Sequence, residues 1–286
     1  MNHVKRNKKD RFDGKYIDLE AFHRFIPYLL NKRCHAEAFL REEFDVTEVL
    51  RYICFKNAGG QKNVTLFNIF VAAIVYTFSK RPHLNRFICG KRYYQREVID
   101  VGFVAKKSFT DDSEEALVRI PFEPFSTLDS IIAKMQPDIQ QARSEKVDNA
   151  NSIINALVNF PRPILSLIVT FLRILNFYGK MPRSLTVGDP NFASVFISNM
   201  GSIKASAPYH HLNEWGTNSI FITIGEIKKK AVCDSEGNLT VRDIVEFGIT
   251  IDERIADGFY YSKSIKILEE ALLNPGQLET DYREDH

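Results

Sequence analysis

The last third of the chain is a succession of apolar strand patterns that ends in one helical pattern, and this order constrains the fold most. Strands are expected at residues 194–199, 219–224, 229–233, 239–241 and 246–251, with a hairpin loop over 234–238. A closing helix follows, with inward apolar residues Tyr261, Ile265, Leu268 and Leu272, and Asn274-Pro275-Gly276 to end it. These strands need helices from elsewhere in the chain to cover them.

The first two thirds of the chain supply those helices and further strands. Helical spacing predicts helices over 18–30, 65–78 and 127–147, and a helix that follows Asp45-Val46-Thr47. Strands are predicted over 38–44, 98–105 and 116–120, and a hairpin that turns at Gly90. No linker rich in Pro, Gly or Ser divides the chain. We therefore expect one mixed α/β domain over 16–278, a flexible basic N-terminus over 1–15 and a polar tail over 279–286.

The segment 153–178 has two interpretations. Pro161 and Pro163 interrupt it, and an apolar stripe follows, formed by Ile164, Leu167, Ile168, Phe171, Leu172 and Leu175. The simpler interpretation is a core helix that covers the sheet. The alternative is a wall for a long acyl chain or a contact with a membrane surface. The longest apolar run, 164–172, is too short to span a bilayer, which needs about 20 residues.

Composition and charge narrow the class of protein. The net charge of +2 gives no global field that favours nucleic acid, and the basic cluster over residues 5–11 is typical of a solvated tail. The four cysteines have no Cys-x-x-Cys spacing, which favours buried thiols over disulfides or metal ligands. The N-terminus lacks the apolar core of a secretory signal. We therefore expect a cytoplasmic protein.

Seven short motifs occur in order along the chain. They are Ile17–Arg24, Phe44–Leu50, Arg81–Arg86, Gly179–Pro182, Phe196–Gly201, Phe221–Gly225 and Asp252–Gly258. In this order they resemble motifs of the coenzyme A-dependent acyltransferases, which include chloramphenicol acetyltransferases and the catalytic domain of 2-oxo acid dehydrogenase dihydrolipoyl acyltransferases. The resemblance covers residues 16 to 278, and no single motif is specific.

The resemblance implies a fold, an assembly and a substrate. The fold would be a two-layer α/β sandwich of the chloramphenicol acetyltransferase type, a mixed sheet with helices packed on it. The protein would be a homotrimer with each active site at a subunit interface. It would take coenzyme A or acyl-coenzyme A as substrate, with a small-molecule acyl acceptor and no metal.

The resemblance also assigns roles to individual residues. Ser198 matches the serine that donates a hydrogen bond to the oxyanion, a contribution of about 3 kcal/mol in comparable sites. Asp257 matches an aspartate that pairs with an arginine of the N-terminal helix, here Arg24, to hold the signature turn. Thr223 matches a threonine that holds a water near the intermediate, although a lone strand hydroxyl is equally expected there.

Glu253 departs from the family pattern. The signature reads Asp-His-Arg-x-x-Asp-Gly or His-His-x-x-x-Asp-Gly in the two families, and its catalytic histidine falls on Glu253. A histidine lies roughly 2 pKa units below a thiol and a glutamate roughly 4, so the change costs nearly 3 kcal/mol in proton abstraction. Burial could raise the pKa of the carboxyl and recover this. Alternatively Glu253 pairs with a cation, and the adjacent Arg254 is the obvious partner.

A replacement base is available in the segment 209–216. Tyr209-His210-His211 is followed by Glu214 and the only tryptophan, Trp215. His210 or His211 with a glutamate could act as base and orienting carboxylate, or the segment could be a surface loop. Metal binding by both histidines and Glu253 is less favoured, because adjacent side chains point apart on an extended chain.

Three functions remain open at this point. The first is an acyltransferase with an altered general base and a thiol, hydroxyl or amine acceptor. The second is a non-catalytic trimeric relative that serves as a binding or assembly module. The third, and least favoured, is a thioesterase-like hydrolase in which Glu253 activates water.

Overall fold

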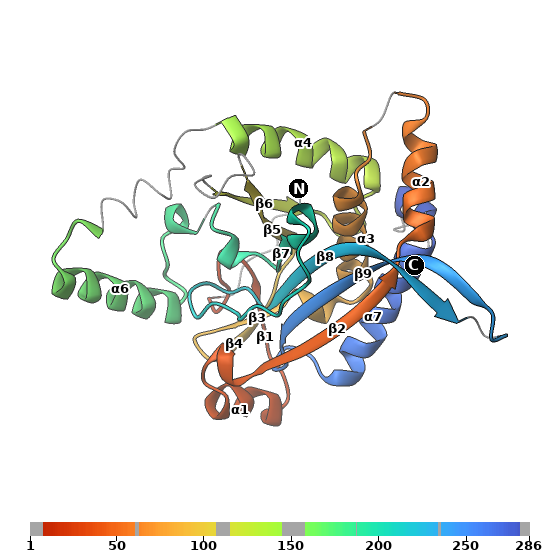
Figure 1. The fold of residues 1–286 in the computed structure, drawn as a ribbon. Helices are drawn as coiled ribbons and strands as arrows, with labels where there is room; N and C mark the ends of the chain where they lie inside the picture. The colour runs from red at the N-terminus through yellow and green to blue at the C-terminus, as the bar shows by residue number, and fades with distance from the viewer. Residues whose placement is uncertain are drawn as a thin grey trace.

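A mixed sheet is the centre of the fold (Figure 1). The computed structural model describes residues 8–60, 63–106, 115–144, 158–186, 188–233 and 236–280. In these ranges six strands pair in the order β2 (Glu37–Asp45), β9 (Leu239–Asp252), β8 (Ile220–Cys233), β7 (Val195–Asn199), β5 (Ile99–Lys106), β6 (Glu115–Phe122). β7 runs parallel to both β5 and β8, and the other pairs are antiparallel. The predicted mixed α/β fold class is confirmed.

Helices cover one face of this sheet. They are α2 (Thr47–Asn57), α3 (Leu66–Lys80), α4 (Leu128–Ser144) and α7 (Gly258–Leu273). α3 is buried along most of its length, and Thr65 caps it in a reciprocal pair of hydrogen bonds with Asn68. Phe247 of β9 packs edge-to-face on Phe44 and on Phe70, with ring centroids 5.0 and 5.2 Å apart. The two-layer sandwich that the motifs imply is therefore present.

The opposite face of the sheet carries the residues of functional interest. Ser198, Thr223 and Gly248 are neighbours across β7, β8 and β9, and Phe196 and Phe221 are paired two residues earlier. Their chain neighbours Ile197 and Ile222 point into the helix-covered core. Because side chains alternate along a strand, Ser198 and Thr223 lie on the face away from the helices.

Two strand boundaries differ from the sequence expectation. The separate strands expected on either side of residues 225–228 form the single strand β8, and those on either side of 242–245 form the single strand β9. A register shift between Ile224 and Ile227 absorbs the interruption in the apolar pattern. Residues 234 and 235 of the expected hairpin loop lie outside the described residues.

A small second sheet ties down the N-terminal segment. It has the order β1 (Lys15–Ile17), β4 (Arg92–Gln95), β3 (Arg86–Cys89), and the predicted turn at Gly90 has left-handed φ values of 57° and 60° at Gly90 and Lys91. Residues 10–15 are packed here, whereas Lys8 and Lys9 are exposed; Arg11 is only 3% exposed and finds partners in the interior. Residues 1–7 lie outside the described ranges.

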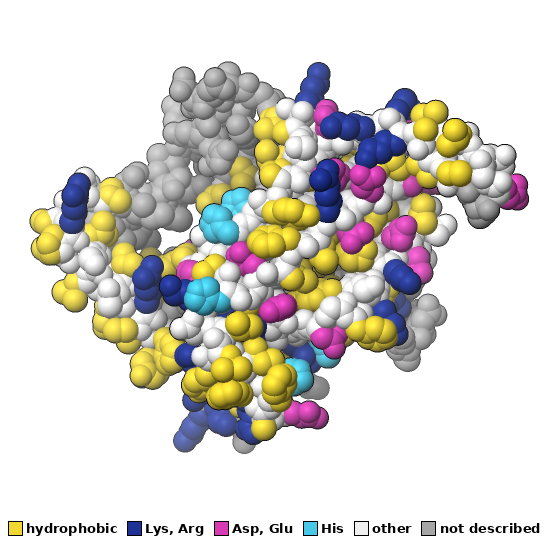
Figure 2. Space-filling model, turned by 60° about the horizontal axis from the view of Figure 1, so that its bottom comes forward, with side chains coloured by type: hydrophobic (Ala, Val, Ile, Leu, Met, Phe, Trp, Pro, Cys, Tyr) yellow, Lys and Arg dark blue, Asp and Glu magenta, His cyan; other side chains and the backbone are white. Residues whose placement is uncertain are grey.

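Helix α6 (Arg162–Phe177) is not the core helix that was predicted for this segment. None of its residues is buried, and its long axis extends away from the sheet (Figure 1). Its C-terminus is fixed against the hairpin, since a Cβ on Gly90 would lie 2.0 Å from the carbonyl oxygen of Phe177. Hydrophobic side chains gather along α6 and on α1 (Ala21–Leu29) (Figure 2). Within the described ranges, no helix combines the length and apolarity needed to cross a bilayer.

Candidate functional site

Ser198 and Thr223 lie side by side on the open face of the sheet. Ser198 is half-buried and its Oγ contacts the Met200 sulfur at 3.5 Å. Thr223 is 2% exposed and donates its hydroxyl towards the carbonyl oxygens of Pro208 and Gly248. The hydrogen of Thr223 is therefore committed to the backbone, and only its oxygen lone pairs remain for a water.

Gly248 allows the segment after β7 to cross this face. A Cβ there would lie 2.6 Å from the Thr223 hydroxyl oxygen and 2.8 Å from the Pro208 carbonyl oxygen. The crossing chain continues to His210, whose ring stacks on Phe221 at 4.1 Å between centroids. Phe221 in turn stacks on Phe196 at 4.8 Å. His210 thus lies beside the Phe196–Phe221 pair, which precedes the Ser198–Thr223 pair by two residues along the strands.

The two histidines stack on each other rather than pointing apart. Their ring centroids are 4.6 Å apart, which contradicts the expectation for an extended chain. His210 Nδ1 lies 2.8 Å from the carbonyl oxygen of His211. A carbonyl only accepts, so this contact requires a proton on Nδ1 and leaves Nε2 of the neutral ring as the basic atom. In the described residues no His, Cys, Asp and Glu group is suited to hold a metal.

Glu253 is exposed at the end of β9. Its backbone N–H donates to the carbonyl oxygen of Ala36 at 2.9 Å, and in the described part of the chain its carboxylate has no hydrogen-bond partner. It contacts neither His210 nor His211 through a hydrogen bond. Ser198 is paired with Thr223, and Thr223 with Gly248 of β9. Glu253 is five residues after Gly248, which is about 17 Å along the strand direction at roughly 3.4 Å per residue. One copy of the chain does not bring Ser198 and Glu253 together.

Arg254 binds Asp252 instead of Glu253. Its Nε and Nη2 each donate to the carboxylate of Asp252 at 2.7 Å, and both side chains are buried, with 4% and 0% exposure. The remaining Nη1 donates to the carbonyl oxygen of Leu30 at 2.7 Å. The signature turn is therefore tied to the end of α1 through Arg254.

The expected ion pair between Arg24 and Asp257 is not formed. Arg24 lies 3.4 Å from Asp18, and both side chains are more than half exposed. Asp257 instead caps α7, where its carboxylate accepts from the backbone N–H of Tyr260 at 2.7 Å. α1 begins after Glu20, whose side chain makes no capping hydrogen bond. The bidentate pair of Asp252 and Arg254 holds the turn, a role that sequence reasoning gave to Arg24 and Asp257.

A cavity of about 200 Å³ lies beside the signature turn. It is enclosed by the end of α1, the Arg33–His35 turn, the β3–β4 hairpin, the end of α6 and the Glu214–Gly216 segment. Arg33 is 6% exposed and donates to the carbonyl oxygens of Asn213 and Gly216 at 2.8 Å each, while its buried Nε has no hydrogen-bond partner among the described residues. Burial lowers the pKa of Arg33. Sequence reasoning missed Arg33.

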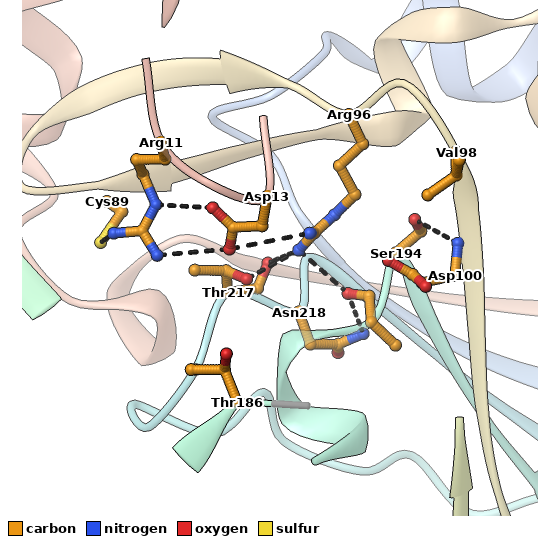
Figure 3. Close-up of polar contacts among 12 residues, drawn as sticks. Arg11, Asp13, Cys89, Arg96, Val98, Asp100, Thr186, Ser194, Thr217 and Asn218 are labelled. Atoms are coloured by element: carbon orange, nitrogen blue, oxygen red, sulfur yellow. Dashed lines mark hydrogen bonds and ion pairs between the residues drawn. The ribbon is translucent and has the colours of Figure 1, made fainter. Parts of the chain in front are cut away.

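A buried polar network supports the hairpin side of this cavity (Figure 3). Asp13 lies 2.8 Å from Arg11 and 4.0 Å from Arg96. Arg11 also donates to the sulfur of Cys89, which lines the cavity. Burial raises the pKa of Cys89 and lowers that of Arg96 to about 10. Burial and the raised pKa both disfavour the thiolate form of Cys89.

Comparison of the sequence with known protein families finds a similarity to one family of enzymes. Residues 181–280 match the family model of the 2-oxoacid dehydrogenases acyltransferase (catalytic domain). The chain has the acyltransferase fold. The matched residues include Ser198, Thr223 and Glu253, whereas the cavity is formed largely by residues that precede the match. No curated protein sequence matches.

Solved structures extend the similarity to nearly the whole chain. A probable dihydrolipoamide acetyltransferase from Listeria monocytogenes 4b F2365 superimposes with a TM-score of 0.60 at 15% identity, over 93% of this chain and 96% of the other. The dihydrolipoamide acetyltransferase of Azotobacter vinelandii gives 0.54 at 14%, over 92% and 94%. A chloramphenicol acetyltransferase gives 0.51 at 16%, over 91% and 99%. The acyltransferase resemblance of the motifs is confirmed at the level of the fold.

Proposed function

We propose that this protein is a coenzyme A-dependent acyltransferase that works as a homotrimer. It would move an acyl group between a coenzyme A thioester and a thiol, hydroxyl or amine acceptor. Ser198 would donate to the oxyanion, and Glu253 of a neighbouring copy would stand where the related enzymes carry a histidine.

The observation that supports this proposal most is the placement of Ser198 and Glu253. Ser198 is available on the open face of the sheet, and the exposed Glu253 is about 17 Å further along the ladder by strand rise. A reaction that uses both residues therefore needs two copies of the chain. The Azotobacter structure concerns the role of a serine, a histidine and an asparagine in that enzyme's catalytic mechanism. Its histidine and asparagine are four residues apart, as Glu253 and Asp257 are here.

Two groups compete for the role of general base. Glu253 has no cation bound to its carboxylate in the described chain, because Arg254 is occupied by Asp252. His210 has its Nε2 free for a proton and lies on the same sheet face as Ser198. If Glu253 is the base, an adjoining copy must bury it enough to raise its pKa.

The alternative is a non-catalytic trimeric relative that serves as a binding or assembly module. The observation that favours it is that neither candidate base is oriented by another side chain within the described residues. The Glu253 carboxylate has no hydrogen-bond partner there, and Nδ1 of His210 donates only to a backbone carbonyl oxygen. A working base is normally oriented by a third group, which for Glu253 would have to come from the substrate or a second copy.

Three variants test the proposal, with acetyl-coenzyme A as donor and dihydrolipoamide as acceptor. Ser198→Ala should lower transfer by about 100-fold or more, because one oxyanion donor is lost. Glu253→Gln should abolish transfer if Glu253 is the base, and His210→Gln should do so if the histidine is. Light scattering should give the mass of three chains. A monomer in solution, or full activity in Ser198→Ala, would overturn the proposal.

A further inference from the structure

We propose that the cavity beside the signature turn binds an anionic group, a carboxylate or a phosphate, carried by the acyl acceptor. The assignment of this anion to the acceptor rests on the proposed acyltransferase function. The anion site itself rests on the charge and burial of the cavity walls.

The walls of the cavity are positively charged. Arg33, Lys91, Arg173 and Arg254 line it, against the single carboxylate of Glu214. Arg254 is neutralised by the buried carboxylate of Asp252, which leaves three cations facing one anion. An electropositive concavity of this kind concentrates anions.

Arg33 is the strongest sign of a missing partner. Its side chain is buried, yet among the described residues no carboxylate lies within 4.0 Å of its guanidinium nitrogens. The two Nη atoms donate to neutral carbonyl oxygens and Nε donates to nothing. A buried cation without an anion is costly, and a carboxylate or phosphate in the adjoining cavity would supply the missing charge.

The size of the cavity limits what it holds. A volume of about 200 Å³ accommodates an anionic head group with a few carbons. Ile88, Trp215 and Phe177 provide apolar wall beside the cations. The geometry favours a small acidic molecule, or the acidic end of a larger one.

The position of the cavity connects it with the acyl-transfer site. Arg254 lines the cavity and is the chain neighbour of Glu253, the candidate base. An anion held at Arg33 would anchor its molecule beside the turn that carries Glu253. The other source of the same chemistry is a phosphate of coenzyme A, and the experiment separates the two.

The test is isothermal titration of the complete protein with inorganic phosphate. Arg173→Gln removes an exposed cation from the rim, and Lys91→Gln removes a partly buried one that also contacts Pro27 and Tyr28; Arg33→Gln is avoided because Arg33 is buried and its loss would affect folding. Arg92→Gln is the matched control, because it removes the neighbouring charge on the same hairpin from outside the cavity. We expect phosphate to bind, each rim variant to weaken it about five-fold or more, and the control to leave it unchanged.

Two outcomes overturn the anion site: no phosphate binding to the wild-type protein, or equal weakening by Arg92→Gln. Competition with coenzyme A decides the source. If coenzyme A displaces phosphate, and Lys91→Gln and Arg173→Gln weaken both ligands, the cavity belongs to the coenzyme and the acceptor assignment is wrong. If phosphate binds as expected and Ser198→Ala leaves acyl transfer unaffected, the anion site stands and the proposed function fails separately.

Discussion

Replacing Asp252 by Ala should be among the most destabilising single changes in this protein. The carboxylate is fully buried and accepts two hydrogen bonds of 2.7 Å from Arg254, whose side chain is 4% exposed. Removing it leaves a buried guanidinium without an anion, a loss of about 3–5 kcal/mol. The unfolding entropy of a chain of this length is about 0.6 kcal/mol/K, so the melting temperature should fall by roughly 5–8 °C.

Differential scanning calorimetry at one fixed protein concentration measures this change, since oligomerisation makes melting temperature concentration-dependent. Arg24→Ala is the control, because its ion pair with Asp18 is exposed and contributes at most about 1 kcal/mol. If the two variants melt together, the buried pair does not hold the signature turn and the reasoning is refuted.

Three further predictions concern separate parts of the fold. Gly90→Ala should cost more than about 1 kcal/mol in chemical denaturation, because its φ is left-handed and the new Cβ meets Phe177; wild-type stability would contradict this packing. Leu167→Glu should change the unfolding free energy of a dilute single chain by less than about 0.5 kcal/mol, since the side chain is 70% exposed. A larger loss would mean that another surface covers α6. The hydrogen bond from Lys56 lowers the pKa of Glu279, so this carboxylate stabilises the fold above its unfolded pKa and the contribution disappears as pH falls through the folded pKa. Glu279→Gln should therefore flatten the loss of melting temperature below about pH 4.5, and an unchanged acid profile would contradict the shift.

The fold and the pair of Ser198 and Thr223 could be predicted because both depend on local pattern. The alternation of apolar residues sets strands and faces, and the two strand motifs Phe196–Gly201 and Phe221–Gly225 place both hydroxyls on one face once β7 and β8 pair.

The ion pairs could not be predicted because their partners are chosen by tertiary packing. Asp257 is the N-terminal residue of a helix and its carboxylate satisfies the backbone there, which leaves Arg24 on the solvent side of α1. Asp252 is the last residue of β9, and Arg254 lies two residues later in the turn that follows, where its guanidinium meets the carboxylate. The closeness of the two residues in the chain was the available signal for the buried pair.

Helix α6 and the N-terminal segment show the same limit. An apolar stripe at helical spacing has the same sequence signature whether a sheet, a second copy or a membrane covers it. Arg11 lies in a basic run that is typical of a solvated tail, yet Asp13 and Asn176 satisfy its guanidinium in the interior. The partner that decides each case is remote in the chain.

Subunit complementation tests the two-copy acyl-transfer site most directly. Ser198→Ala and Glu253→Gln chains would be prepared separately and by co-expression, and loss of acetyl-coenzyme A in the presence of dihydrolipoamide would be followed by mass spectrometry. Each variant alone should be inactive. In randomly mixed trimers about one interface in four would join an intact Ser198 to an intact Glu253, so about a quarter of wild-type activity should return. Mixed oligomers no more active than the separate variants would contradict a site assembled from two copies of this chain.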